Sequence, residues 1–188
     1  MFKIRLLIFS ALLPALFVTG ACQSAMVMAG LKKAPPPVTD SAYFNGQMEK
    51  LLERLKANKS RNFRRAAVLS FVNTNGKVSE LGKILTIKFG ERAVAGNHFR
   101  VVPSGQVKQA LETLKIDFKG ELTKEQVKLI GDELKADAVI TGKISDLQKG
   151  SDVDLTVSAI QPSTGDLVSA AGINIYRSKQ VQTLIQQF

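Results

Sequence analysis

Apolar and polar positions divide the chain into an apolar leader, a proline-rich stretch and a series of short periodic elements. After the N-cap candidates at 39–41, apolar residues at helical spacing predict an amphipathic helix over about 41–58. Its apolar stripe consists of Phe44, Met48, Leu51, Leu52 and Leu55. We expect this stripe to pack against the domain that follows.

Residues 66–72 form a continuous apolar run of strand length, which predicts a central strand covered on both faces. From Asp152 the period changes to two, and residues 152–159 and 167–176 flank a turn, so they predict an antiparallel hairpin. The remaining periodic segments predict strands over 98–102 and 138–144 and helices that start near Ser79, Ser104, Thr123 and Lys179.

The order β-α-β-α-α-β-β-β predicts a single three-layer α/β domain with a mixed sheet. The sheet should be parallel where helices cross over and antiparallel in the late hairpin. We assign 41–65 to the amphipathic helix and a basic segment, 66–188 to the domain, and the last ten residues to a short C-terminal helix. An exposed edge of the sheet could pair with a strand of a partner.

The N-terminus is typical of an export signal. A short basic region precedes an apolar run, Leu6 to Val18, that is too short to span the roughly 30 Å of hydrocarbon in a membrane. Small residues end the run directly before the only cysteine, Cys22. We therefore predict a signal peptide over 1–21 and an exported mature protein.

The sequence Thr19-Gly20-Ala21-Cys22 resembles a bacterial lipobox, although Thr19 stands where leucine is usual. The resemblance implies cleavage before Cys22 and lipid on its thiol, and the absence of Asp after it implies sorting to the outer membrane. The alternative is an ordinary secretory signal cut after Ala21 or Ala25. If Cys22 carries lipid, residues 22–40 form a lipid-anchored tether, and its eighteen residues after Cys22, three of them consecutive prolines, could extend about 55 Å as polyproline II.

The formal charge of +10 is concentrated in one place. Residues 50–65 carry seven bases and one acid, whereas 66–188 are nearly neutral. A general nucleic-acid binder would spread its charge over a face of the domain, so we expect no nucleic-acid partner. We expect the segment to lie at the membrane-proximal end of the domain, where an anionic surface or partner would meet Lys56, Lys59, Arg61, Arg64 and Arg65. The alternative is a solvated helix end and loop.

The chain offers little for catalysis. One cysteine excludes an internal disulfide and multi-cysteine metal sites, and the single histidine, His98, excludes sites that need two. No phosphate-binding loop or dinucleotide motif follows the first strand, and no nucleophile elbow surrounds Ser70. We expect a non-enzymatic protein without a cofactor or metal, with His98 at a surface or boundary position.

Several segments together resemble the FlgO family of flagellum-associated outer-membrane lipoproteins, over about residues 63–177. These segments are 67–72, 79–82, 99–102, 122–123, 136–144 and 163–170. The likeness is shared more loosely with the curli-secretion lipoprotein CsgG and the amino-terminal domain of TolB. Within the matching segments, Asp137 suits a left-handed or capping position.

The resemblance implies an outer-membrane lipoprotein with a periplasmic domain that supports flagellar assembly, stability or motility through protein–protein contacts. Its partners would be the outer membrane, through lipidated Cys22, flagellar or other envelope proteins, and a second copy of the chain. One alternative is an envelope lipoprotein that reaches through peptidoglycan and activates a peptidoglycan synthase. Another is a curli-type secretion-channel component, which would need membrane strands of about ten residues. The Asp and Ser residues of the hairpin argue against lipid contact.

Overall fold

The computed structural model describes residues 40–146 and 152–187, and the predicted signal peptide, Cys22 and nearly all of the predicted tether lie outside them. The amphipathic helix, the basic segment and the sheet belong to one compact unit, Val38–Phe188. In chain order its elements are α2 (Asp40–Ala57), β1 (Arg65–Val68), β2 (Val72–Asn73), α3 (Glu80–Ala95), β3 (Arg100–Val101), α4 (Ser104–Thr113), α5 (Lys124–Leu134), β4 (Ala138–Ser145), β5 (Asp152–Ile160), β6 (Leu167–Tyr176) and α6 (Lys179–Gln186).

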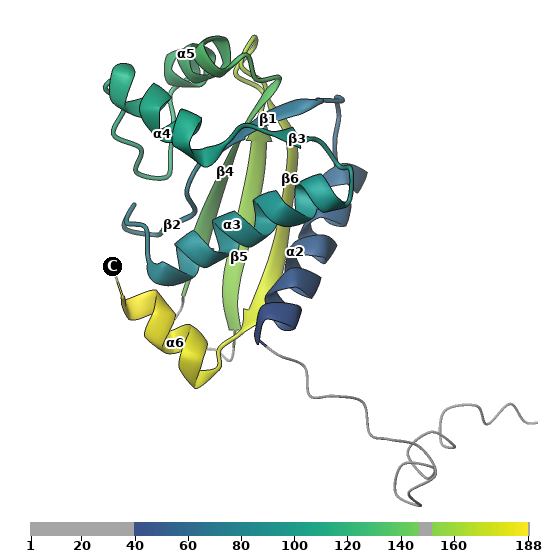
Figure 1. Cartoon of the computed structure of the whole chain (residues 1–188), viewed down its shortest axis with the longest axis vertical. Helices are drawn as coiled ribbons and strands as arrows, with labels where there is room; N and C mark the ends of the chain where they lie inside the picture. Colours follow the sequence, from purple (N-terminus) through teal and green to yellow (C-terminus); the bar gives the residue numbers. More distant parts are fainter. Residues whose placement is uncertain (1–39, 147–151, 188) are drawn as a thin grey trace, which may run out of the picture. The chain divides into compact units, whose positions relative to one another are not determined.

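The strands form one mixed sheet in the order β3-β1-β4-β5-β6, with β2 also paired to β4 (Figure 1). The pairs β1–β3, β1–β4 and β2–β4 are parallel, whereas β4–β5 and β5–β6 are antiparallel. This confirms the predicted α/β class, with parallel pairing after the helical crossovers and an antiparallel late hairpin.

The apolar run 66–72 differs from its prediction, because it is not one continuous strand and β4 occupies the centre of the sheet. The ladder stops after Val68 and resumes at Val72. In between, the Phe71 N–H donates to Thr86 Oγ1 on α3, at 2.8 Å. The Phe71 ring is fully buried and lies over Gly142 of β4. The run is apolar because it is buried, but the backbone N–H of Phe71 donates to a helix residue and not to a neighbouring strand.

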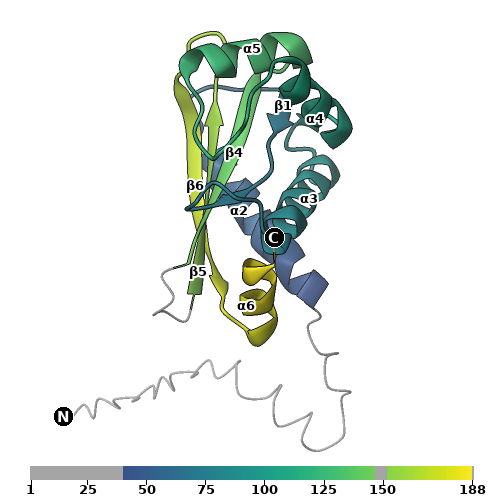
Figure 2. The same ribbon diagram turned by 90° about the vertical axis from the view of Figure 1, so that its left-hand side faces the viewer.

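Successive residues of the inner strands point to opposite faces of the sheet and enter two separate cores. Ala66 and Ile140 belong to the core under α2, α3 and α6, whereas Ala67 and Val139 belong to the core under α4 and α5. Figure 2 shows the sheet nearly edge-on, with α3 along it and α5 across one end. Helices on both faces make the domain three-layered, as predicted.

The apolar stripe of α2 packs as expected, since each of its five residues is at most 5% exposed. This packing places α2 beside β6, the last strand of the sheet (Figure 1). Among the described residues, none of the helices has the length and hydropathy needed to cross a membrane.

The outer edge of β6 is already bonded by α2 and by the loop after it. The bonded groups lie at even-numbered positions along β6, as expected for one edge of a strand. Ser60 Oγ donates to the Val168 carbonyl, Asn58 Nδ2 to that of Ala170 and Arg54 Nη1 to that of Gly172, and the Tyr176 N–H donates to Tyr43 Oη. The structure therefore does not leave this edge free for a partner strand, and covering it also prevents edge-to-edge aggregation.

Candidate functional site

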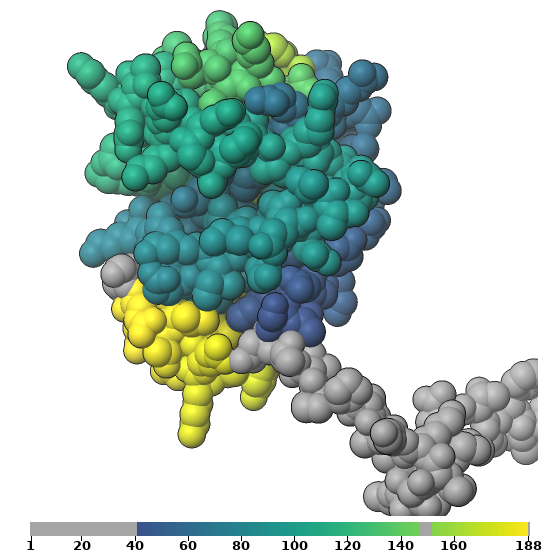
Figure 3. Space-filling model, in the orientation of Figure 1, coloured from purple at the N-terminus to yellow at the C-terminus, as the bar shows by residue number. Residues whose placement is uncertain are grey.

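We call residues 58–65 the basic loop: they lead from α2 into β1, whose first residue is Arg65, and carry four of the five predicted contact residues. The fifth, Lys56, lies in the last turn of α2. All five are exposed except Arg65, which is partly buried. The loop lies at the end of α2 opposite Asp40, where the predicted tether joins the domain (Figures 1 and 3). The 18 residues of α2 separate the two ends by about 27 Å. The basic loop is therefore not at the tether end of the domain, contrary to our expectation.

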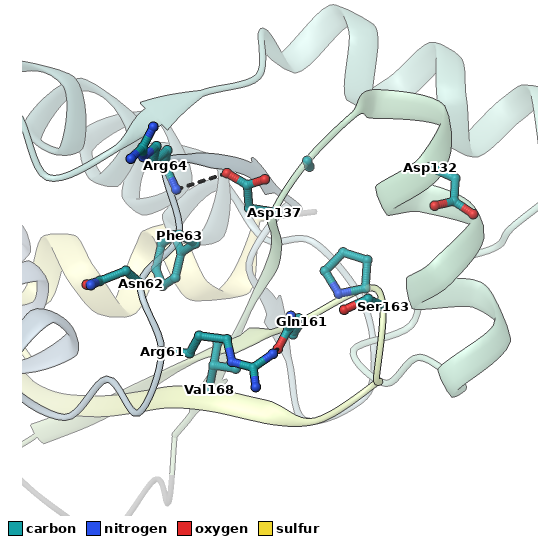
Figure 4. Close-up of a pocket in the computed structure, with 11 residues that line it drawn as sticks. Arg61, Asn62, Phe63, Arg64, Asp132, Asp137, Gln161, Ser163 and Val168 are labelled. Carbon is teal, nitrogen blue, oxygen red and sulfur yellow. Dashed lines mark hydrogen bonds between the residues drawn. The ribbon is translucent and has the colours of Figure 1, made fainter.

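Asp137 fixes the basic loop to the sheet. Its Oδ2 accepts a hydrogen bond from the Arg64 N–H at 3.0 Å (Figure 4). The same oxygen accepts one from the Arg65 N–H, also at 3.0 Å. In return the Asp137 N–H donates to the Arg65 carbonyl at 2.8 Å. The left-handed conformation that we considered for Asp137 is adopted instead by Lys135, which ends α5 with φ 48°. Asp137 thus acts as an anchor for the loop backbone.

A cavity of about 540 Å³ lies between the basic loop, the end of α5 and the turn from β5 to β6. In Figure 4 the Arg61 side chain points toward Gln161, and its Nη1 donates to Gln161 Oε1 at 2.9 Å. The Arg64 guanidinium points away from Asp137. Guanidinium, amide, hydroxyl and carboxylate groups all line the walls, which suits polar contacts with another surface.

The five predicted contact residues differ from other basic residues of the domain in their ion pairing. Within the part of the chain that the structure describes, none of the five forms an ion pair. Arg61 bonds to a neutral amide, and Arg65 Nε donates to the Leu134 carbonyl at 3.2 Å. By contrast, Lys83 and Lys128 each pair with an acid on their own helix. The positive potential at this end of the domain is therefore available to an anionic partner.

A second group of side chains was not predicted. His98 Nε2 lies 3.5 Å from Glu49 Oε1 and 3.7 Å from Glu53 Oε1. His98 as a whole residue is partly buried, which agrees with the boundary position that we expected, but its side chain is only 4% exposed. The i,i+4 spacing of the two glutamates on α2 was visible in the sequence, but only packing of α2 against α3 brings His98 to them.

We expect Asp137→Ala to free the backbone of the basic loop. The substitution removes two charge-assisted hydrogen bonds, and because the site is exposed and water can replace them, the loss of folding free energy should be about 1–2 kcal/mol. Hydrogen exchange should speed up at the Arg64 and Arg65 amides. Asp132→Ala is the matched control, since Asp132 lines the same cavity but pairs with Lys128. Equal protection of the two amides in both variants would contradict the anchoring role.

The sequence matches no family model and no curated protein. Solved structures do match. The C-terminal domain of LpoB from Escherichia coli aligns with a TM-score of 0.58 at 17% identity, over 71% of this chain and 98% of that one. The corresponding domain from Salmonella enterica gives 0.55 at 18% identity, with the same coverage. The NMR structure of E. coli LpoB gives 0.58 at 16% identity, over 94% of this chain and 84% of that one.

At these identities the likeness shows a shared fold. The domain therefore has the fold of the LpoB C-terminal domain. These comparisons give no support to the resemblance to the FlgO family or to its flagellar role.

Proposed function

We propose that this chain is a non-enzymatic outer-membrane lipoprotein whose periplasmic domain contacts and activates a peptidoglycan synthase. The observation that carries the proposal is the fold that the described domain shares with the C-terminal domain of LpoB, in an alignment that covers 98% of that domain. It favours the synthase activator over the flagellar component among the alternatives that the sequence left open. The curli-type channel is disfavoured because Asp152 and Thr156 of β5 are exposed polar residues.

The anchor in this proposal is Cys22, with lipid on its thiol, followed by the proline-rich tether. The domain would then lie in the periplasm, attached through Asp40 at the start of α2. Replacing Cys22 with Ser should move the protein from the membrane fraction to the soluble fraction and abolish lipid labelling.

We assign partner contact to the basic loop together with Lys56. The supporting observations are the absence of ion pairs to it among the described residues, its fixed backbone and its position at the far end of α2 from Asp40. That end lies about 27 Å from Asp40, where the chain enters the domain, which favours a partner protein over the membrane that holds the anchor. An acidic surface of the synthase is the expected complement.

The test is reconstitution of the full-length lipidated protein with purified synthase from the same bacterium, with glycan polymerisation as the measured rate. We expect the protein to raise this rate, and an unchanged rate at saturating protein would contradict the proposal. Replacing all five contact residues with Gln should weaken binding by tens of fold, at about 0.5 kcal/mol for each charge. The loss should be largest at low ionic strength.

A charge-matched control separates this surface from net charge. It replaces five exposed lysines elsewhere in the domain with Gln: Lys50, Lys108, Lys115, Lys124 and Lys179. Equal weakening by both variants would show that net charge alone matters. A deletion strain that loses its flagella while synthase activity is unchanged would restore the flagellar interpretation.

A further inference from the structure

The side chains of Glu49, Glu53 and His98 do not line the polar cavity of the basic loop, and together they have the composition of a metal site. The two glutamates are one helical turn apart on α2, so their side chains leave the same face. His98 follows the end of α3 and points between them. The nitrogen and the two carboxylate oxygens all lie within 4.8 Å of one another.

The backbone at the end of α3 is shaped to hold this imidazole. Asn97 adopts a left-handed conformation, φ 52°, which turns the chain so that the His98 N–H donates to the Ala93 carbonyl at 3.0 Å. A Cβ at position 96 would lie 2.6 Å from His98 Nε2, so Gly96 provides the space that the ring occupies. The Nδ1 atom of His98 is buried without a hydrogen-bond partner among the described residues. The ring is thus held in place mainly by packing.

The local charges favour a cation. Two carboxylates face the imidazole, and the negative end of the α3 dipole lies beside it. Positive charges also lie near His98: Lys56 and Lys59 line a small cavity next to it, and Arg64, Arg65 and Arg100 line a larger one. Since neither lysine pairs with an acid in the described structure, we expect them to reduce the affinity without occupying the position between the carboxylates.

The distances suit a small transition-metal ion. Two ligands of a tetrahedral zinc ion at 2.0–2.1 Å from the metal lie roughly 3.3 Å apart. The separations of His98 Nε2 from the two carboxylate oxygens, 3.5 and 3.7 Å, are close to this value, and the two oxygens lie within 4.8 Å of each other, so rotation of the glutamates must bring them closer together. The glutamate side chains are about half exposed, which leaves an open side for water as a fourth ligand. Because one ligand is an imidazole nitrogen, calcium and magnesium fit the group poorly.

We propose that Glu49, Glu53 and His98 bind a divalent transition-metal ion of the zinc class and thereby link α2 to α3. Binding would strengthen the attachment of α2, because the ion contributes to stability only when the two helices are packed together. This proposal does not depend on the function proposed above, since it concerns only the attachment of α2 to the domain.

The test uses the full-length chain without a histidine tag, so that His98 is its only imidazole. Zinc chloride is added while the ring nitrogens of His98 are followed by ¹⁵N NMR and binding by calorimetry. We expect one zinc ion per chain, a shift of the His98 Nε2 signal and a higher melting temperature. Magnesium chloride should produce none of these effects.

Glu49→Gln, Glu53→Gln and His98→Gln should each weaken zinc binding at least about tenfold, since even loss of an outer-shell partner typically costs that much. Glu112→Gln, an exposed helical glutamate outside the cluster, is the control and should bind like the parent. The two cluster glutamates are half exposed, so their variants should fold even if His98→Gln does not. A His98 signal that responds to pH but not to zinc would overturn the proposal, as would equal zinc binding by Glu49→Gln and the control.

Discussion

Phe71→Ala should lower the free energy of unfolding by about 3–5 kcal/mol, as expected for a buried aromatic side chain whose removal leaves a cavity. The Phe71 ring is fully buried and meets the Phe89 ring edge-on, with centroids 5.6 Å apart. It also fills the gap where the first strand is interrupted, so no neighbouring strand residue can take its place. Chemical denaturation of the full-length protein, followed by circular dichroism, measures the loss.

Gly142→Ala should be destabilising for the complementary reason. A Cβ at this position would lie 2.3–2.7 Å from three atoms of the Phe71 ring. The ring is fully buried and β4 is paired on both sides, so neither the ring nor the strand can move away easily. Overpacking of this kind costs about 1–3 kcal/mol. The penalty should fall in a Phe71→Ala background, because the clashing atoms are gone.

The matched control is Gly46→Ala on α2. No atom lies within 4 Å of the added Cβ. Because alanine favours a helix more than glycine does, the substitution at this exposed position should raise the free energy of unfolding by up to about 1 kcal/mol. If Gly142→Ala destabilised the protein equally with and without the Phe71 ring, the contact between the two residues would not be the cause.

Leu51→Ala together with Leu55→Ala should loosen α2, at about 2–5 kcal/mol for each buried leucine. Because α2 and the loop after it bond the outer edge of β6, a loosened helix exposes that edge. We therefore expect concentration-dependent self-association in addition to lower stability. Light scattering across a dilution series, beside denaturation curves, measures both effects.

Leu129→Ala is the control for this pair, since it is the same substitution at a leucine of α5 that is 47% exposed. It should change stability only slightly and leave the protein monodisperse. A double variant that unfolds more easily but stays monodisperse at all concentrations would contradict the role of α2 in covering the edge.

Local signals made much of the fold predictable. Ser79 and Thr123 cap α3 and α5 as expected, and Thr123 forms a reciprocal capping box with Gln126. The hairpin was predictable because one face of β5 and β6 is buried, which produces alternation. Ser104 was less informative, since α4 starts there without a side-chain cap.

Features that depend on distant residues were not predictable. The break at Phe71 depends on Thr86 and Gly142, which lie on two other elements. Similarly, the sequence suggests only a local turn role for Asp137, since its hydrogen-bond partners, the N–H groups of Arg64 and Arg65, lie far away in the sequence. The contact of His98 with the glutamates of α2 likewise joins residues that are far apart in the sequence. In each case the partner is set by packing and leaves no periodic or spacing signal.

The position of the basic loop also determines how the domain would carry mechanical force. If a partner holds the basic loop while the anchor pulls at Asp40, the tension acts between the two ends of α2. Its main path runs through the hydrogen bonds of one helix, and the strand ladders of the sheet are not pulled apart. Under tension, the helix itself should therefore extend before the sheet unfolds.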